Sequence, residues 1–562
     1  MKCNVAIIGG GPAGSTVGTF LRKHRPDLEV CIFEGDLFPR DHVGESQLPA
    51  VPVILNELGV WDKVEAADFP IKLGARYRWG PEGDDDLWES LFIRDGEFQD
   101  QPRPGKYEGQ RAQTAFQVDR AIFDEILLDH SAEMGCQVFE ETRVVNVLRN
   151  GDAVDHLVVK DKTGEEETVF ADWFVDASGA SATIRKAFDI PVDSPTALKN
   201  IAIWDYWQNA DWAELVGVGG TLVQVMSLSY GWLWFIPLGP TRTSIGLVTS
   251  ADYYKNCGLS TDALYRESIA KEPRITKLVE NASREDRLQA TKDWSFIAGR
   301  MAGENWFLVG DASGFADPIL AAGMTLAMTG AKRVAFSILE IMRGEVDEDW
   351  LKGEYERIQS KHVGNHIRFA NYWYSLNGKF TDLRAYCSDI ARNAGLELEP
   401  DDAFQWLGTG GFTDEFSGIP FAGTFDVSAI KALAKKYSGQ PISWTFQKNN
   451  VFELRLEGAR KDVVGVYEDG RVHQVECYFR DGKTLPMYLL FGFVFRALQK
   501  EREILFIWER TGFEAKRAGF TRTRELARVW FEVLEVLVIE GWVEASFDPA
   551  VQMMSQAPIM RK

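Results

Sequence analysis

The sequence predicts an α/β fold of the doubly wound, Rossmann-like class, with an added antiparallel sheet and a C-terminal α+β extension. The first observation is an apolar strand at residues 4–8, followed by a glycine-rich turn, a helix over 13–23 and a second strand at 29–33. This order is the βαβ unit from which parallel sheets are built. The second observation is a pair of later apolar runs, at 173–176 and 306–309, which predict further strands of the same buried sheet.

Segments between those two runs predict the antiparallel sheet. They are rich in β-branched and aromatic residues, are separated by Gly, Pro and Asp turns, and cover 201–207, 221–229 and 243–248. After residue 346 the apolar residues recur with helical spacing, and beyond Gly439-Gln440-Pro441 short strands and an amphipathic helix follow.

These patterns predict three regions along the chain. A nucleotide-binding domain is expected over 1–344, with the antiparallel sheet interleaved at about 69–116 and 190–295. A helical segment is expected over 345–440, and a small α+β module over 441–562.

Composition excludes several classes of protein. The 562 residues carry a formal net charge of −21, which repels the phosphates of nucleic acids and of anionic membranes. No apolar run reaches the roughly 18 residues of a membrane span, and no signal peptide precedes the first strand, so we expect a cytoplasmic protein. The six cysteines are dispersed without a C-x-x-C pair, and we expect no metal site.

The glycine-rich turn has the spacing of a dinucleotide site. Gly9 permits the tight turn, Gly11 lets the backbone approach a pyrophosphate, and Gly14 allows close helix packing. Glu34 ends the second strand at the spacing where a carboxylate accepts hydrogen bonds from ribose hydroxyls. An isolated glycine motif is equally compatible with a packing turn, but the strand, the helix and the acid are all in place. The predicted binding residues of the turn are Gly9, Gly11, Pro12, Ala13 and Gly14.

Two later elements indicate FAD rather than NAD as the dinucleotide. Asp176-Ala177-Ser178-Gly179 follows one predicted strand, and Gly310-Asp311-Ala312 follows the other. The Asp311 carboxylate can bind hydroxyl groups of the ribityl chain or near the pyrophosphate. A helix of small residues begins near Gly323, where its N-terminus can support negative charge on the isoalloxazine.

At these positions the chain resembles the flavin monooxygenase superfamily, so the 1–344 domain is expected to be an FAD-binding domain of that type. Gln117-Val118-Asp119-Arg120 precedes a helix as in that group, and Phe38-Pro39-Arg40 with Gly44-Glu45-Ser46 is similar to its cofactor-lining loop. The resemblance implies cofactor contacts for Arg40, Ser46, Gln117 and Arg120. Because no second glycine motif is present for a nicotinamide, a separate flavin reductase is expected to deliver reduced FAD.

One stretch narrows the chemistry. Gly231-Trp232-Leu233-Trp234-Phe235-Ile236-Pro237 contains the W-x-W-x-I-P signature of flavin-dependent halogenases. Lys72 stands among apolar residues where similar halogenases have their essential lysine, and desolvation there would lower the pKa of its amine. The plain alternatives are two core tryptophans on one face of a strand and a solvated surface lysine.

The resemblance implies a division of labour between the cofactor and the lysine. FADH2, O2 and chloride or bromide form hypohalous acid, which passes to Lys72 and halogenates an electron-rich substrate there. Trp232 and Trp234 keep the substrate away from the flavin, and the halide is expected at the backbone amides near Gly323-Met324.

The tryptophan-modifying halogenases have a glutamate where this chain has Leu320-Ala321-Ala322-Gly323. The sequence is therefore closer to the natural-product branch that acts on phenols, pyrroles or acyl groups held on carrier proteins. Asp293 is placed similarly to the aspartate that one branch bonds covalently to FAD, and an ordinary turn carboxylate is the alternative.

Two rival functions use the same scaffold. One is a flavin hydroxylase or a geranylgeranyl-reductase-like enzyme, since a fold does not determine a reaction. The other is a non-catalytic flavoprotein whose C-terminal module binds partners.

Overall fold

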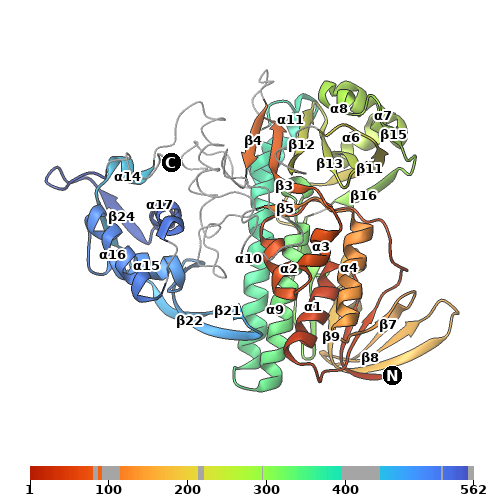
Figure 1. Ribbon diagram of the computed structural model, residues 1–562, viewed down its shortest axis with the longest axis horizontal. Helices are drawn as coiled ribbons and strands as arrows, with labels where there is room; N and C mark the ends of the chain where they lie inside the picture. Colours follow the sequence, from red (N-terminus) through yellow and green to blue (C-terminus); the bar gives the residue numbers. More distant parts are fainter. Residues whose placement is uncertain are drawn as a thin grey trace. The chain divides into compact units, whose positions relative to one another are not determined.

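The first sheet contains the predicted βαβ unit, formed by β1 (Lys2–Ile8), α1 (Pro12–His24) and β2 (Val30–Phe33). β1 pairs in parallel with β2 and with β9 (Glu166–Asp176), and β9 pairs in parallel with β18 (Trp306–Leu308). The carboxyl ends of these strands therefore meet at one edge (Figure 1). The predicted doubly wound class is confirmed.

The computed structural model describes most of the chain, and its contacts divide it into two units, Met1–Gly395 and Leu396–Lys562. The described residues are 1–79, 87–91, 114–212, 220–293, 295–375, 377–393, 444–519 and 523–554. Each unit is described by itself.

Helices and further strands complete the first sheet. β6 (Gln137–Phe139) pairs with β2, while β8 (Ala153–Lys160) and β7 (Arg143–Asn150) continue the sheet in antiparallel sense beyond β9. α4 (Arg120–Glu133) and α9 (Gly323–Arg343) pack against α1. The first turns of α9 and α1 lie close together, because Ala13 and Ala327 both lie against Gly310.

The second sheet is the one predicted on the substrate side. Its central strands are β11 (Asn200–Gln208), β14 (Arg242–Ser250), β13 (Gly231–Pro237), β12 (Gly220–Leu228) and β3 (Ile71–Arg78), in that order. Neighbours pair antiparallel as predicted, except that β12 and β3 run parallel. Since more than a hundred residues separate β3 from β12, no short hairpin forces them to be antiparallel.

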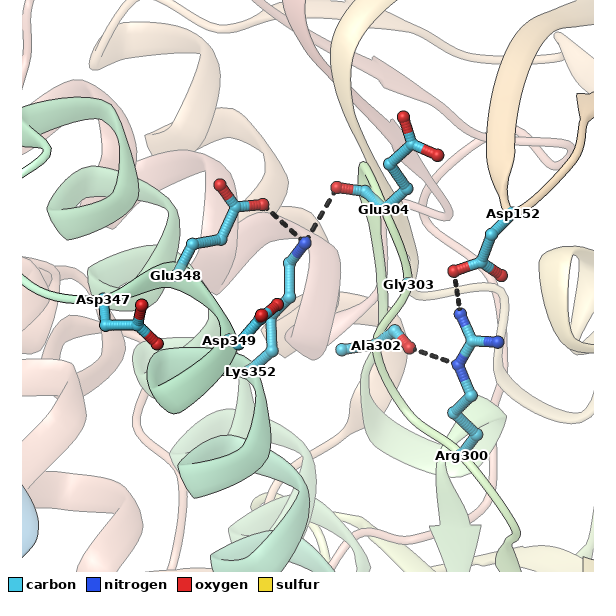
Figure 2. Close-up of a pocket in the computed structure, with 9 residues that line it drawn as sticks. All are labelled: Asp152, Arg300, Ala302, Gly303, Glu304, Asp347, Glu348, Asp349 and Lys352. Carbon is cyan, nitrogen blue, oxygen red and sulfur yellow. Dashed lines mark hydrogen bonds and ion pairs between the residues drawn. The ribbon is translucent and has the colours of Figure 1, made fainter.

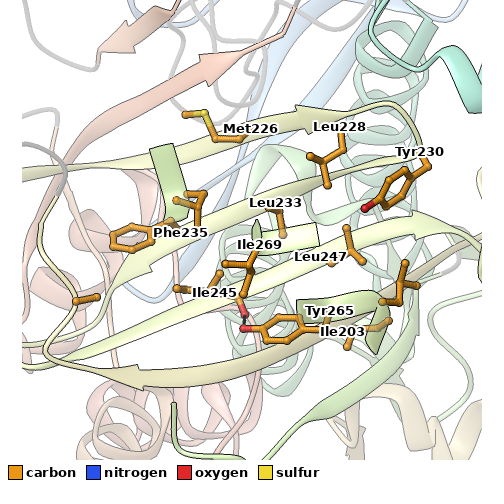
Figure 3. Close-up of a cluster of buried hydrophobic side chains, with 13 residues drawn as sticks. Ile203, Met226, Leu228, Tyr230, Leu233, Phe235, Ile245, Leu247, Tyr265 and Ile269 are labelled. Atoms are coloured by element: carbon orange, nitrogen blue, oxygen red, sulfur yellow. Dashed lines mark hydrogen bonds between the residues drawn. The ribbon is translucent and has the colours of Figure 1, made fainter. Parts of the chain in front are cut away.

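One face of this second sheet is an apolar core. Strand residues such as Met226, Leu233 and Leu247 pack against α7 (Thr261–Lys271) and α8 (Pro273–Leu278) (Figure 3). Side chains alternate along each strand, so the opposite face carries a different set of residues. That opposite face holds the predicted catalytic residues.

The long helix α10 (Glu348–Ser375) packs against α9 and brings the chain back toward the second sheet, followed by α11 (Arg384–Asn393) (Figure 1). The shorter elements of this unit are α2 (Ala50–Leu58), α3 (Trp61–Ala66), β4 (Trp88–Leu91), β5 (Ala115–Phe116), α5 (Thr183–Ala187), β10 (Val192–Asp193), α6 (Ala251–Asn256), β15 (Ser283–Arg284), β16 (Gln289–Asp293), β17 (Phe296–Ala298) and β19 (Gly314–Phe315).

The second unit has the predicted α+β composition. Its two small sheets pair β20 with β24 and β21 with β22 and β23. The elements are α14 (Thr445–Lys448), β20 (Val451–Leu454), β21 (Arg460–Glu468), β22 (Arg471–Arg480), β23 (Lys483–Pro486), α15 (Leu489–Leu498), α16 (Ile504–Arg517), α17 (Thr523–Ile539) and β24 (Val543–Ser546). The boundary expected at 439–441 lies outside the described residues. Among the helices that are described, none combines the length and the apolar character needed to cross a bilayer.

The apolar face of the second sheet predicts a stability effect. Leu247 is fully buried in it, so Leu247→Ala should lower the free energy of unfolding by about 2–5 kcal/mol, through lost burial and an unfilled cavity. Leu259→Ala is the matched control because Leu259 is 36% exposed. Urea unfolding of both variants measures the difference, and equal losses would contradict this view of the core.

Candidate active site

The glycine turn after β1, residues 9–14, leaves an open space beside its backbone, which is called the cradle below. A Cβ at Gly14 would lie 1.9 Å from the Gly9 carbonyl oxygen, so only glycine lets α1 start so close to the strand. Gly9 itself has a φ of +101°, a conformation that side chains disfavour. At Gly11 the nearest atom to a Cβ would be the Arg40 Nη2, 3.6 Å away. The backbone at Gly11 is therefore open to a ligand and lies beside a guanidinium, as pyrophosphate binding requires.

Glu34 lies at the edge of this cradle. Its Oε2 accepts a hydrogen bond from the Gly10 amide at 2.7 Å, and its Oε1 accepts one from the Asp36 amide at 2.9 Å. Each carboxylate oxygen has a second lone pair, so the group remains able to accept hydrogen bonds from ribose hydroxyls. Pro12 and Ala13, the first residues of α1, follow Gly11 directly in the same turn.

Arg120 stands at the first position of α4, where the sequence placed it. Its guanidinium forms a bidentate pair with Asp124 at 2.7 and 2.8 Å, and it donates to the Val43 carbonyl at 2.9 Å. Asp311 follows β18 and faces this arginine. Burial raises the pKa of Asp311 to about 6, although the positive charge of Arg120 opposes the shift.

Several polar groups around this cradle are buried without a hydrogen-bond partner in the described part of the chain. They are the Ser46 hydroxyl, both polar atoms of the Gln117 amide and the Thr325 hydroxyl. Leaving such groups unpaired costs free energy that a bound ligand would recover. With the open glycine turn, they fit a large polar cofactor such as FAD. Arg40, Glu34, Arg120 and Asp311 would hold it together with the amides of the turn.

The start of α9 connects the cradle with Lys72. Gly323 is the first residue of α9, Gly310 lies against Ala13 of α1, and Met324 is almost fully buried. The Gln47 Nε2 approaches the Met324 sulfur at 3.3 Å, and the carbonyl of the same glutamine accepts a hydrogen bond from the Lys72 Nζ at 2.9 Å.

Lys72 is buried in β3, with only 2% of its surface exposed. Desolvation lowers the pKa of its amine to about 7, because the charged ammonium loses water that the neutral amine needs less. A surface lysine, the plain alternative at the sequence level, is excluded by this burial.

Trp232 and Trp234 are buried in β13 with their indole rings 6.0 Å apart. The Trp232 indole nitrogen donates to the Tyr374 hydroxyl at 2.8 Å, and that of Trp234 donates to the Ser244 hydroxyl at 3.0 Å. A Cβ at Gly246 would lie 2.1 Å from the Trp234 ring, so this indole rests directly on the backbone of β14.

Strand register places the lysine and the tryptophans on one face. Lys72 pairs with Thr221 of β12, whereas Trp232 pairs with Ser227 of the same strand. Thr221 and Ser227 are an even number of residues apart and therefore point the same way. Because β12 lies between β3 and β13, and Thr221 stands six residues before Ser227, the backbones of Lys72 and Trp232 are about 10 Å apart across the sheet and about 20 Å apart along it.

Sequence patterns did not identify Glu45, Asp317, Tyr374 or Ser244 as neighbours of the tryptophans. Glu45 and Asp317 are each 2% exposed. Burial raises the pKa of Glu45 to about 7. The Gly44-Glu45-Ser46 and Asp317-Pro318 motifs were visible in the sequence, but nothing in them indicates a link to β13. Asp293 ends β16, and its backbone pairs with Asn200 of β11.

A separate cavity of about 620 Å³ lies in the same unit, between the turn before β18 and the start of α10 (Figure 2). Its cations are paired, Arg300 with Asp152 and Lys352 with Glu348. None of the predicted site residues line it, so it is distinct from the cradle.

Comparison with known proteins identifies the family. The FAD binding domain family matches residues 2–370. A tryptophan 2-halogenase of Chondromyces crocatus is 33% identical over 379 residues, which are 67% of this chain and 68% of that protein. The chain belongs to the flavin-dependent halogenases. The chain is also 30% identical, over 392 residues, to a 1H-pyrrole-2-carbonyl-(peptidyl-carrier protein) chlorinase of Pseudomonas fluorescens. The match covers 67% of this chain and 85% of that protein.

A solved structure of similar fold extends over the whole halogenase. CmlS, a flavin-dependent halogenase, superposes with a TM-score of 0.72 at 24% identity and covers 100% of this chain and 98% of its own. The fold of the C-terminal unit is therefore included in that likeness.

The open space at Gly11 predicts a selective effect on FAD binding. Gly11→Ala should leave the thermal stability of the FAD-free halogenase unchanged, because the new methyl meets nothing closer than 3.6 Å. The same methyl would stand where the pyrophosphate approaches the backbone, so the Kd for FAD should rise at least about tenfold. Flavin fluorescence titration measures the Kd. Gly353→Ala, in open space on α10, is the control, and an unaltered FAD affinity in Gly11→Ala would refute this placement of the cofactor.

Proposed function

We propose that this halogenase relays hypohalous acid to Lys72 and there halogenates an electron-rich substrate. The observation that carries the proposal is the buried Lys72 amine, which lies on the same sheet face as Trp232 and Trp234. Gln47 contacts both the Lys72 amine and Met324 at the start of α9, and so connects the two.

Reduced FAD supplies the electrons with which O2, a halide ion and a proton give hypohalous acid and water. The N-terminus of α9 supports a chloride or bromide site near Gly323 and Met324, because its free amides and helix dipole favour an anion. The buried Thr325 hydroxyl, which has no partner among the described residues, is a further donor there.

Lys72 receives the oxidant in a dry environment. With a pKa near 7, a large share of the amine is neutral at physiological pH and able to react with hypohalous acid or to donate a hydrogen bond to it. The halogen then replaces a ring proton of the substrate, and water leaves with that proton. Positioning by a buried amine selects which carbon reacts.

Trp232 and Trp234 form the barrier in this proposal. They fill the same sheet face two strands away from the lysine and four to six residues further along it, which separates the substrate from the cofactor while a small neutral oxidant passes. Substrate excluded from the cofactor escapes hydroxylation, which supports halogenation over the hydroxylase alternative.

The substrate we propose is a phenol, a pyrrole or a ring held on a carrier protein. The apolar Leu320-Ala321-Ala322 segment, in place of a glutamate, supports this class over free tryptophan. One relative is named as a tryptophan 2-halogenase and another as a chlorinase of a carrier-bound pyrrole, so the shared chemistry is attack on an electron-rich ring.

Two features of the cofactor belong to the same proposal. A separate flavin reductase delivers reduced FAD, as the single glycine motif suggests. Asp293 is the candidate for covalent attachment of the flavin, because its backbone lies beside Asn200, whose side chain contacts Asp317 in the turn before α9. Intact mass of the denatured holoenzyme tests this, since free chain mass alone would contradict attachment.

Removing the amine should separate oxidant formation from halogenation. Lys72→Met replaces a desolvated amine with an apolar side chain of similar length, so folding should be preserved. We expect at least about a 100-fold loss of halogenated product, with unchanged FAD affinity and continued oxidant formation, measured by monochlorodimedone trapping and mass spectrometry. Lys352→Met, at the cavity of Figure 2, should retain full activity. Halogenation within twofold of wild type in Lys72→Met would eliminate the relay.

The lowered pKa of Lys72 predicts a pH profile. The neutral amine predominates above its pKa, so single-turnover halogenation with chemically reduced flavin should rise between about pH 6 and pH 8 with a midpoint near 7. Oxidant trapping by Lys72→Met, measured at each pH, gives the pH dependence of the earlier steps. The wild-type halogenation rate is divided by this trapping rate at each pH. If the resulting ratio is flat or falls with rising pH, the neutral amine is excluded as the reacting form.

A further inference from the structure

Each barrier tryptophan donates a hydrogen bond to a hydroxyl group that lies beside a buried carboxyl group. From Trp232 the path runs through the Tyr374 hydroxyl, which contacts the Asp317 Oδ1 at 3.2 Å. From Trp234 it runs to the Ser244 hydroxyl, which accepts from the indole nitrogen at 3.0 Å and lies close enough to the Glu45 carboxyl group to oppose the rise of its pKa. Two independent side chains, one on α10 and one on β14, thus play the same part.

The two carboxyl groups are themselves held firmly. Asp317 accepts hydrogen bonds from the Asn200 side chain at 2.8 Å and from the Ile319 amide at 2.9 Å. Glu45 accepts one from the Tyr206 hydroxyl at 3.3 Å. A buried carboxyl group is costly unless its oxygens are hydrogen-bonded, so each network has a strong preference for this arrangement.

Both carboxyl groups belong to loops of the FAD cradle rather than to the second sheet. Asp317 begins the turn that ends at Gly323, the first residue of α9. Glu45 lies between Ser46 and Gly44, and a Cβ at Gly44 would lie 3.2 Å from the Arg120 guanidinium. The networks therefore join the indoles of one sheet to the loops that surround the cofactor on the other.

We propose that Tyr374 and Ser244 are positioning residues that fix the Trp232 and Trp234 indoles relative to the FAD cradle, through Asp317 and Glu45. This inference rests on the proposed barrier role of the two tryptophans. An indole on a strand has several staggered orientations, and the hydrogen bond from its nitrogen selects one of them. When the bond is lost, the ring gains freedom and the barrier leaks oxidant and water.

The tests are Tyr374→Phe and Ser244→Ala, each of which removes one hydroxyl and little volume. In either variant we expect the ratio of halogenated product to O2 consumed to fall at least threefold, with hydrogen peroxide accounting for the difference. FAD affinity should stay close to wild type, and thermal stability should fall no further than in Tyr265→Phe, which also leaves an indole nitrogen unpaired. The two hydroxyl groups lie on different elements, so if one variant fails to fold, the other variant still tests the inference.

Tyr265→Phe is the matched control. The Tyr265 hydroxyl also accepts a hydrogen bond from an indole nitrogen, that of Trp207 at 2.9 Å, and it donates to the Ile245 carbonyl. It lies in the apolar core on the other face of the same sheet (Figure 3). Its loss should leave the product ratio unchanged.

A second readout needs neither cofactor nor turnover. In FAD-free protein labelled with 5-fluorotryptophan, the ¹⁹F signal of Trp232, assigned with Trp232→Phe, should shift or broaden in Tyr374→Phe and stay in place in Tyr265→Phe. If wild type forms no halogenated product, the proposed function fails, while this signal still reports on the hydrogen bond between Trp232 and Tyr374. If wild type halogenates, and Tyr374→Phe and Ser244→Ala both keep its product ratio and its ¹⁹F spectrum, the inference is overturned.

Discussion

Water exclusion around the Lys72 amine is the constraint on which the rest of the active site depends. An ammonium group in that position loses most of its hydration, so the folded protein shifts the amine toward its neutral form. β3 is covered on both faces, and the Gln47 carbonyl accepts a hydrogen bond from the buried amine at 2.9 Å. In the proposed relay, the same burial would keep bulk water away from the oxidant at the amine.

Local patterns predicted the parts of the fold that depend on neighbouring residues. The βαβ unit, Gly14 at the crossing of α1 and β1, and Arg120 at the start of α4 are all written in short stretches of sequence. Lys72 and the two tryptophans were placed by family motif, and their common face follows from strand alternation once the register is known.

Pairings between distant parts of the chain were beyond the reach of these patterns. Tyr374 is 142 residues from Trp232, and in sequence it is one aromatic residue among others on an α10 stripe. The parallel pairing of β12 with β3 likewise depends on how the intervening chain folds, which no local propensity specifies. Glu45 gives no sign in sequence that its carboxyl group is buried, since its neighbours are loop-forming residues.

The contact between Trp234 and Gly246 has a consequence for how this enzyme can diverge. The indole lies against bare backbone, so any larger residue at 246 would have to be matched by a smaller ring at 234. In the proposed relay, the space beside Trp234 is therefore set jointly by β13 and β14. A single enlargement at 246 would displace the indole, whereas a paired change at 246 and 234 would alter the space at this point of the sheet without that clash.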